Sequence, residues 1–235
     1  MLLYQLSFFM NKIVNIFNVT KKKIFQKIGE HKKIRLSERF YNIYPNQSLR
    51  GRKFLNIGPG KFRHKYWTNL DYNTDYYKKY IGEHNIDFNI MAMNRIPFKD
   101  NEIEAIYSSH CIEHIESSAI KFLLKECLRV LKPGGFLRFQ CPDADLVYNS
   151  YLYSSLAFYD NLINEAKSKK ISKDFSTEQL LLNMIGTKII DKGKYSKDNI
   201  RKTLKRKKKE EFLDFLISKS SFDKKRPYRH INWFN

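Results

Sequence analysis

Apolar residues in the central part of the chain form short runs bounded by turn residues such as glycine, proline and aspartate. Some runs are continuous and others alternate with polar residues, and runs of four to eight residues of either kind are typical of strands. A continuous run is typical of a strand buried on both faces. The sequence therefore predicts four strands, at residues 53–57, 66–70, 102–109 and 136–141.

A helix is predicted between the third and fourth of these strands. Apolar residues recur at intervals of three and four over residues 117–131, and Ser117 and Ser118 are candidate N-caps. Residues 132–135, Lys-Pro-Gly-Gly, supply the proline and glycines that end a helix. Strands and a helix in this order predict an α/β fold, with a Rossmann-like, mostly parallel sheet flanked by helices.

The flanking parts of the chain have helical patterns. Residues 2–28 have the spacing of one or two amphipathic helices. Residues 144–184 are also helical in pattern, and we expect an insertion that covers one edge of the sheet. Residues 191–211 are mostly polar, which favours a solvated helix or a loop. The predicted organisation is an N-terminal helical extension over residues 1–52, an α/β core over 53–145 and a helical insertion with a basic loop over 146–235.

The net charge of +20 lies in the two flanks. The excess of Lys and Arg over Asp and Glu is ten in residues 1–53, zero in residues 54–150 and ten in residues 151–235. A basic excess attracts nucleic acid or an anionic membrane surface, so either role belongs to the flanks. We regard nucleic-acid binding as disfavoured, and we keep it and contact of the N-terminal helix with a membrane surface as alternatives.

The cellular compartment is predicted from the N-terminus and the cysteines. The 11 residues before Lys12 carry no charge, which is too short a stretch to span a bilayer, and there is no basic start or cleavage site of a signal peptide. The three cysteines are widely spaced, so we predict no metal site and no disulfide framework. A cytoplasmic protein is the expectation, with peripheral membrane contact as the alternative; the oligomeric state stays open.

A glycine-rich turn follows the first predicted strand. Gly58 and Gly60 have no Cβ and allow a ligand to approach the backbone closely. A dinucleotide site needs a third glycine and an acid about 20 residues further on. Here Arg63 stands at the third position and Asp71 follows Gly60 by only 11 residues, so a hydride-transfer enzyme is disfavoured. Asp71, at the end of the second strand, suits two ribose hydroxyls, because a carboxylate accepts strong hydrogen bonds.

Four blocks of sequence, in this order, resemble the class I S-adenosylmethionine-dependent methyltransferases. The resemblance covers residues 53–145. Within the family, this segment is most similar to the small type 11 members that accompany bacterial surface-polysaccharide genes. A weaker likeness lies at residues 183–186 and 230–234. The blocks are Phe-Leu-Asn-Ile-Gly-Pro-Gly at 54–60, Trp-Thr-Asn-Leu-Asp at 67–71, the segment from Ile-Pro-Phe to Glu-His at 96–114, and Glu-Cys-Leu-Arg-Val-Leu-Lys-Pro-Gly-Gly at 126–135.

The resemblance implies that residues 53–145 bind S-adenosyl-L-methionine and that the region after them caps the substrate. Gly58 and Gly60 would then contact the methionine part and Asp71 the ribose. Asp87 would lie near the adenine amino group. Ser109 and His110 would face the sulfonium.

The acceptor and the general base are open at this stage. The candidate bases are His110, His114 and Glu113, because they lie near the expected methyl group, and His230 is a candidate for the acceptor site. A hydroxyl of a surface glycan is the leading acceptor on the resemblance. A lipid or quinone and RNA are the alternatives that the apolar N-terminus and the basic flanks suggest.

Two departures from the resembled family favour a competing hypothesis. Asn56 stands where the first motif usually has an acid. The chain ends at Asn235, where the resembled enzymes continue with a helix and two strands, so we expect an incomplete sheet with an open edge. The competing hypothesis is a truncated or degenerate methyltransferase domain that binds a partner without catalysis, and a second is a basic RNA-binding module.

Overall fold

The computed structural model of the chain describes residues 39–154, 160, 163–164, 176–218 and 220–235. The chain divides into two compact units, residues 1–50 and residues 51–235. The described part of the first unit contains α2 (Asn46–Arg50). The amphipathic helices predicted at residues 2–28 lie outside the described residues. None of the helices that the structure describes has the length and apolar character needed to cross a membrane.

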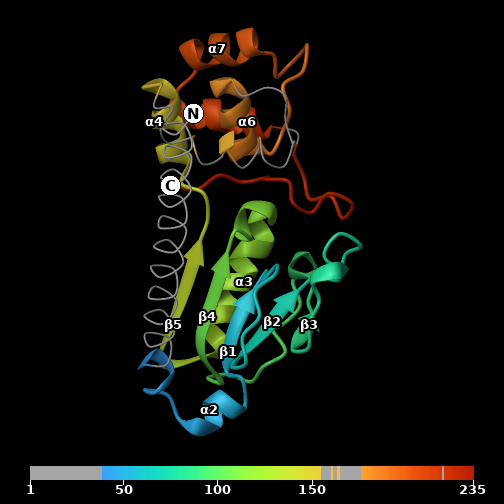
Figure 1. Cartoon of the computed structure of the whole chain (residues 1–235), viewed down its shortest axis with the longest axis vertical. Helices are drawn as coiled ribbons and strands as arrows, with labels where there is room; N and C mark the ends of the chain where they lie inside the picture. Colours follow the sequence, from blue (N-terminus) through green and yellow to red (C-terminus); the bar gives the residue numbers. More distant parts are fainter. Residues whose placement is uncertain (1–38, 155–159, 161–162, 165–175, 219) are drawn as a thin grey trace, which may run out of the picture. The chain divides into compact units, whose positions relative to one another are not determined.

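Five strands form one parallel sheet in the second unit, in the order β3-β2-β1-β4-β5 (Figure 1). This arrangement confirms the predicted Rossmann-like α/β fold. In this order the connections reverse direction between β1 and β4, and such a switch point is where open α/β sheets bind ligands. The strands are β1 (Phe54–Ile57), β2 (Trp67–Asp71), β3 (Asn85–Asp87), β4 (Ile103–Ser109) and β5 (Leu131–Gln140).

The core of the sheet explains why the apolar runs predicted the strands. All four residues of β1 are buried, and so are the apolar residues of β4. β1 pairs with both β2 and β4, so neither face nor edge of it meets water. The strand β3 was missing from the sequence prediction because it has only three residues and none of them is buried.

The helix α3 (Ser117–Val130) confirms the predicted helix, but the predicted N-caps are wrong. The N-cap residue is Glu116, without a side-chain cap, and Ser117 is the first helical residue. The Ser117 hydroxyl instead donates to Asn232 Oδ1 at 3.2 Å. The segment 132–135 follows the helix as expected, yet it belongs to β5, where it shifts the register against β4 between Ile103 and Ala105.

The helices after β5 form a second hydrophobic core. We expected an insertion that covers an edge of the sheet; these helices pack instead against one another, around buried Val147, Leu181, Ile200 and Phe212. The polar run at residues 191–211 is partly helical, and its Ile200 is fully buried, so it is not simply a solvated surface segment. These helices are α4 (Ala144–Leu152), α6 (Thr177–Gly186), α7 (Lys197–Arg206) and α8 (Lys209–Ile217).

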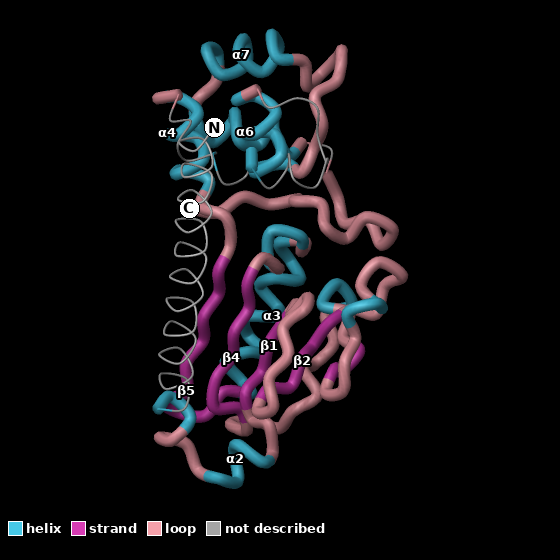
Figure 2. Tube along the Cα trace, viewed as in Figure 1, coloured by secondary structure: helices cyan, strands magenta, loops and turns pink. Residues whose placement is uncertain are grey.

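The C-terminal segment joins the two cores. In Figure 2 it runs as a loop between the sheet and the group of helices. The N–H groups of Ile231 and Asn232 donate to the Glu113 carbonyl at 2.8 and 3.1 Å, and Ala144 N–H donates to the Phe234 carbonyl at 2.8 Å. Three short 3₁₀ helices complete the described elements, η1 (Lys78–Tyr80), η2 (Ile90–Ala92) and η3 (Ile112–His114).

Candidate functional site

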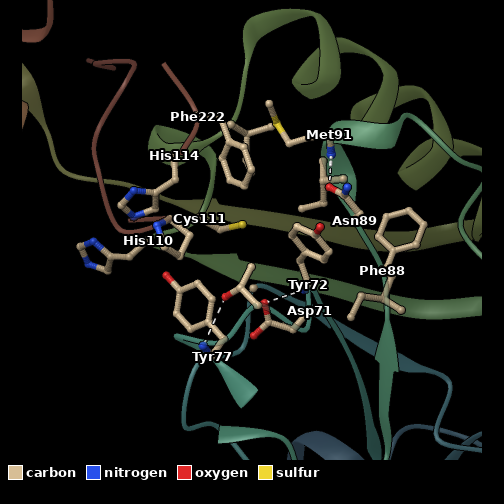
Figure 3. A pocket seen from close by; sticks show the side chains of 16 residues that line it. Asp71, Tyr72, Tyr77, Phe88, Asn89, Met91, His110, Cys111, His114 and Phe222 are labelled. Carbon is tan, nitrogen blue, oxygen red and sulfur yellow. Dashed lines mark hydrogen bonds between the residues drawn. The ribbon is translucent and has the colours of Figure 1, made fainter. Parts of the chain in front are cut away.

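A pocket lies at the carboxyl ends of the central strands (Figure 3). Gly58 follows β1, Asp71 ends β2 and His110 follows β4, and all three residues line it. The pocket has about 560 Å³ of empty space, counted to its open mouth. The pocket therefore occupies the position where the sheet topology predicts a ligand.

Asp71 supplies a carboxylate to the wall of this pocket. Its Oδ1 accepts a hydrogen bond from Tyr72 N–H at 2.9 Å. Burial raises the pKa of Asp71 to about 6; the Tyr72 N–H and the charge of Arg63 oppose this rise, and the charge of Asp87 adds to it. A partly buried carboxylate that has few hydrogen-bond donors of its own is ready to accept hydrogen bonds from a ligand hydroxyl.

The glycine turn after β1 is fixed by backbone conformation and by one close neighbour. Gly58 has a φ of +64°, and a Cβ added there would come within 2.6 Å of Cys111 Sγ. Gly60 has a φ of +51°, and a Cβ there would meet no atom within 4 Å. Gly60 is not among the residues that line the pocket. Gly58 is therefore required by packing as well as by φ, whereas Gly60 is required by φ alone.

Aromatic side chains surround the pocket. Tyr72 and Tyr77 lie near Asp71, Phe88 lies beside Asn89, and Phe222 lies across the pocket from Asp71 (Figure 3). The backbone N–H of Tyr77 donates to Thr74 Oγ1 at 3.3 Å. Burial and the charge of Asp71 raise the pKa of the Tyr77 phenol, so it stays protonated and can donate a hydrogen bond. The pocket thus combines one carboxylate with stacking surfaces.

Four predicted residues, Gly60, Asp87, Ser109 and Glu113, do not line this pocket. Asp87 ends β3 in register with Asp71, and its Oδ1 accepts a hydrogen bond from Asn73 N–H at 3.0 Å. Ser109 is the last residue of β4 and pairs with Gln140. Asn89, two positions after Asp87, does line the pocket, and its side chain accepts a hydrogen bond from Met91 N–H. Asn89 was missing from the sequence prediction because the strand before it was missing.

The turn after β4 brings three of the predicted residues together. His110 has a φ of +53°, and its Nδ1 lies 3.2 Å from Glu113 Oε1. This hydrogen bond raises the pKa of His110. Burial opposes ionisation of Glu113, but the hydrogen bond from His110 and the charge of His114 outweigh it and lower the pKa of Glu113. The three residues form one cluster, in which Glu113 is buried, at 1% exposed, and His110 is exposed.

His230 joins this cluster from the C-terminal segment. The rings of His114 and His230 have centroids 4.9 Å apart. His114 Nδ1 lies 2.9 Å from the Arg229 carbonyl oxygen, so this nitrogen carries the proton and donates it. Burial lowers the pKa of His230 to about 4, and the charge of His114 contributes. His230 and Glu113 line a smaller hollow with Met184 and Trp233, so the two segments of weaker likeness to the family meet here.

Part of the chain is similar to methyltransferases. Residues 59–139 match the family model described as "Methyltransferase domain". Over 82 residues, 35% of this chain, the sequence is 32% identical to the ubiquinone/menaquinone biosynthesis C-methyltransferase UbiE of Desulfotalea psychrophila, and the chain spans 31% of the length of that curated relative. Residues 59–139 contain Asp71, His110 and the other pocket residues from Leu70 to Ile115, whereas Gly58 lies just before the matched segment.

One solved structure is similar only at low level. It is provisionally described as an S-adenosyl-L-methionine-dependent methyltransferase of Methanococcus maripaludis. The identity is 16% and the TM-score 0.30, with 51% of this chain and 61% of the other covered. Similarity of this size carries no argument about function, so the assignment depends on the family match and on the pocket.

Proposed function

We propose that this protein is an S-adenosylmethionine-dependent methyltransferase that uses the pocket at the carboxyl ends of β1, β2 and β4. The observation that carries the proposal is the Asp71 carboxylate in the pocket. Asp71 belongs to the segment that matches a methyltransferase domain, and the Gly58 turn directly before that segment lines the same pocket. This combination favours an enzyme over the alternatives of a degenerate scaffold or a basic RNA-binding module.

The residues of the pocket fit this cofactor. Asp71 can accept hydrogen bonds from both ribose hydroxyls, and Phe88 and Ile90 offer an apolar surface to the adenine ring. The turn at Gly58 leaves the backbone accessible to the methionine part. When bound, the cofactor supplies a methyl carbon that is already activated by its sulfonium, so the protein has mainly to align the acceptor and exclude water.

His110 is our choice for the residue that takes a proton from the acceptor. It lines the pocket, and the buried Glu113 holds its ring by a hydrogen bond. A histidine oriented by a carboxylate in this way is a general base with a fixed tautomer. His114 lines the pocket as well, but its side chain is 14% exposed, against 68% for His110, so an acceptor reaches it less easily. We therefore propose that His114 and Glu113 position groups rather than transfer the proton.

The acceptor we propose is a hydroxyl group, and sugar hydroxyls of a surface glycan are the first candidates. The support is the polar end of the pocket, where His110 and His114 lie. The curated relative is a C-methyltransferase of ubiquinone and menaquinone biosynthesis, so a quinone is the alternative acceptor. A glycan panel and a quinone panel, each assayed for S-adenosylhomocysteine release, separate the two.

The experiment that tests the cofactor is calorimetric titration of the full chain with S-adenosylmethionine. We compare wild type with Asp71→Asn and with the matched control Asp75→Asn, an exposed acid in the same segment. Two lost hydrogen bonds to a charged group predict an affinity on the order of 100-fold weaker for Asp71→Asn. The control should bind like wild type. A folded wild-type chain that binds no S-adenosylmethionine would overturn the proposal and favour the degenerate scaffold.

A further inference from the structure

We propose that Glu113, His114 and His230 form a binding site for a divalent transition-metal ion, with zinc as the ion to be tested. Each residue offers one ligand atom, and these atoms lie within 4.8 Å of one another. The site departs from our sequence prediction of no metal. Two imidazole nitrogens and one carboxylate oxygen are a ligand set of catalytic zinc sites, which have three protein ligands and an open position.

The first argument is an unpartnered oxygen. Glu113 is 1% exposed, and its Oε1 is occupied by the hydrogen bond with His110. Its Oε2 is buried and has no hydrogen-bond partner among the described residues. Buried charged oxygens without a partner are costly and rare. A cation bound to Oε2 would satisfy this atom and leave the contact between Oε1 and His110 intact.

The second argument is the orientation of the two imidazoles. Because His114 Nδ1 donates to the Arg229 carbonyl, Nε2 is the nitrogen with a free electron pair, and it lies 3.9 Å from Glu113 Oε1. The ring of His230 lies against that of His114, with centroids 4.9 Å apart. Metal-binding histidines usually have their second nitrogen fixed in this way, which sets the tautomer and the direction of the ring.

The third argument is that the backbone holds the ligands in advance. The carbonyl of Glu113 accepts hydrogen bonds from the N–H groups of Ile231 and Asn232, directly after His230. The N–H of His230 itself donates to Thr187 Oγ1 at 2.8 Å. Zinc bonds of about 2.0–2.2 Å put neighbouring ligand atoms roughly 3.4 Å apart, so each side chain has to move by less than about 1 Å.

The ligand set selects the class of ion. Calcium and magnesium prefer oxygen ligands only, whereas imidazole suits zinc, copper, iron and nickel. The position also suggests a role, which rests on the function proposed above. Because His114 lines the cofactor pocket, an open coordination position beside it is available to an acceptor oxygen. The ion would then orient the acceptor while it ties the C-terminal segment to the turn after β4.

The experiment is a zinc titration of the chelator-treated full chain against a chromophoric competitor. We expect one ion per chain with a dissociation constant on the order of 1 μM or tighter. Glu113→Gln and His230→Gln should each weaken binding at least about 100-fold, since each removes a ligand. The matched control is His84→Asn at an exposed position, where asparagine tolerates the φ of +70°. A Cys141→Ser variant should also bind like wild type, because no thiol takes part.

Cobalt substitution of the wild-type chain provides a measurement that does not depend on the folding of variants. Visible bands of a four- or five-coordinate ion without a thiolate charge-transfer band support the site, and a thiolate band overturns it. Wild type that binds no zinc, or variants that bind it unchanged, overturn it as well. S-adenosylmethionine titration of the same samples is independent. Binding of the cofactor without zinc removes only the metal site, whereas zinc without the cofactor removes only the proposed function.

Discussion

At the scale of single residues, the candidate site consists of groups whose chemistry depends on their surroundings. Asp71 has a raised pKa because burial disfavours its charged form, while Glu113 stays ionised in spite of deeper burial because two histidines face it. Residue type alone does not distinguish these two carboxylates. The groups around each carboxylate set its pKa, and this difference in pKa can be measured.

The pH dependence of cofactor binding follows from Asp71. Its pKa of about 6 includes opposing effects of the Tyr72 N–H, Arg63 and Asp87. Above pH 6 the carboxylate is ionised and accepts hydrogen bonds; below it the proton occupies an acceptor oxygen. The affinity for S-adenosylmethionine should therefore fall, approaching about tenfold per pH unit below pH 6. Calorimetry between pH 8 and pH 5 measures this fall. Asp71→Asn, as the control, should lack it, and an equal fall in that variant assigns the effect to another group.

Gly58 and Gly60 are predicted to differ in their tolerance of a side chain. Gly58→Ala combines strain from positive φ with a Cβ 2.6 Å from Cys111 Sγ, so it should lower the free energy of unfolding by about 3 kcal/mol. Gly60→Ala has only the strain and should cost about 1 kcal/mol. Urea unfolding followed by circular dichroism measures both values. Equal losses would mean that the contact with Cys111 relaxes without cost.

At the scale of elements, the two sequence blocks at 96–114 and 126–135 prove to be structural partners. Arg129 on α3 donates to the carbonyls of Ile96 and Phe98, each at 2.9 Å. Glu126 accepts from Ile96 N–H at 2.8 Å and from Arg129 Nη2 at 2.6 Å. The hydrogen bond from Arg129 lowers the pKa of Glu126. This pair fixes the loop before β4 on the helix after it.

Removal of this pairing should destabilise the fold without changing the site. Arg129→Ala leaves the buried Glu126 with only the more distant Arg95, whose Nε lies 3.8 Å from Oε1, and should lower the free energy of unfolding by about 3 kcal/mol. The matched control is Lys125→Ala, an exposed position on the same helix, expected within about 0.5 kcal/mol of wild type. Chemical unfolding gives both values. A small loss for Arg129→Ala would show that water replaces the guanidinium at Glu126.

At the scale of the whole second unit, the C-terminal segment connects the sheet core to the helical core. The Asn232 side chain contributes two hydrogen bonds to the start of α3 and the residues before it: it donates to the Ile115 carbonyl and accepts from Ser117. The same segment carries Phe222, which lines the pocket, and His230. The geometry of the candidate site therefore depends on residues more than 100 positions apart in the sequence.

Asn232→Ala should loosen this connection selectively. We expect faster amide hydrogen exchange in residues 222–234 and little change in β1 and β4, because the sheet core does not include the lost contacts. Exchange measured by mass spectrometry resolves these peptides. Asn149→Ala, exposed on α4, is the control and should leave both regions unchanged. Unchanged exchange in residues 222–234 of Asn232→Ala would show that backbone hydrogen bonds alone hold the segment.

The sequence by itself determined four of the five strands of the parallel sheet, the glycine turn after β1 and the place of Asp71 at the end of β2. These features depend on local patterns: a buried strand needs a continuous apolar run, and a tight turn needs glycine, so each leaves a signal within a few residues. It also predicted α3, because helical spacing over 14 residues is a strong periodic signal.

Only the tertiary structure decided which polar residues meet. Asn89 follows a strand too short to leave a pattern. From the far end of the chain, Phe222 comes to the pocket and His230 comes to the smaller hollow at Glu113. Asp87 ends β3 and Ser109 ends β4, yet neither residue lines the pocket. Contacts between distant segments are fixed by packing, and packing depends on the whole chain rather than on any local run of residues.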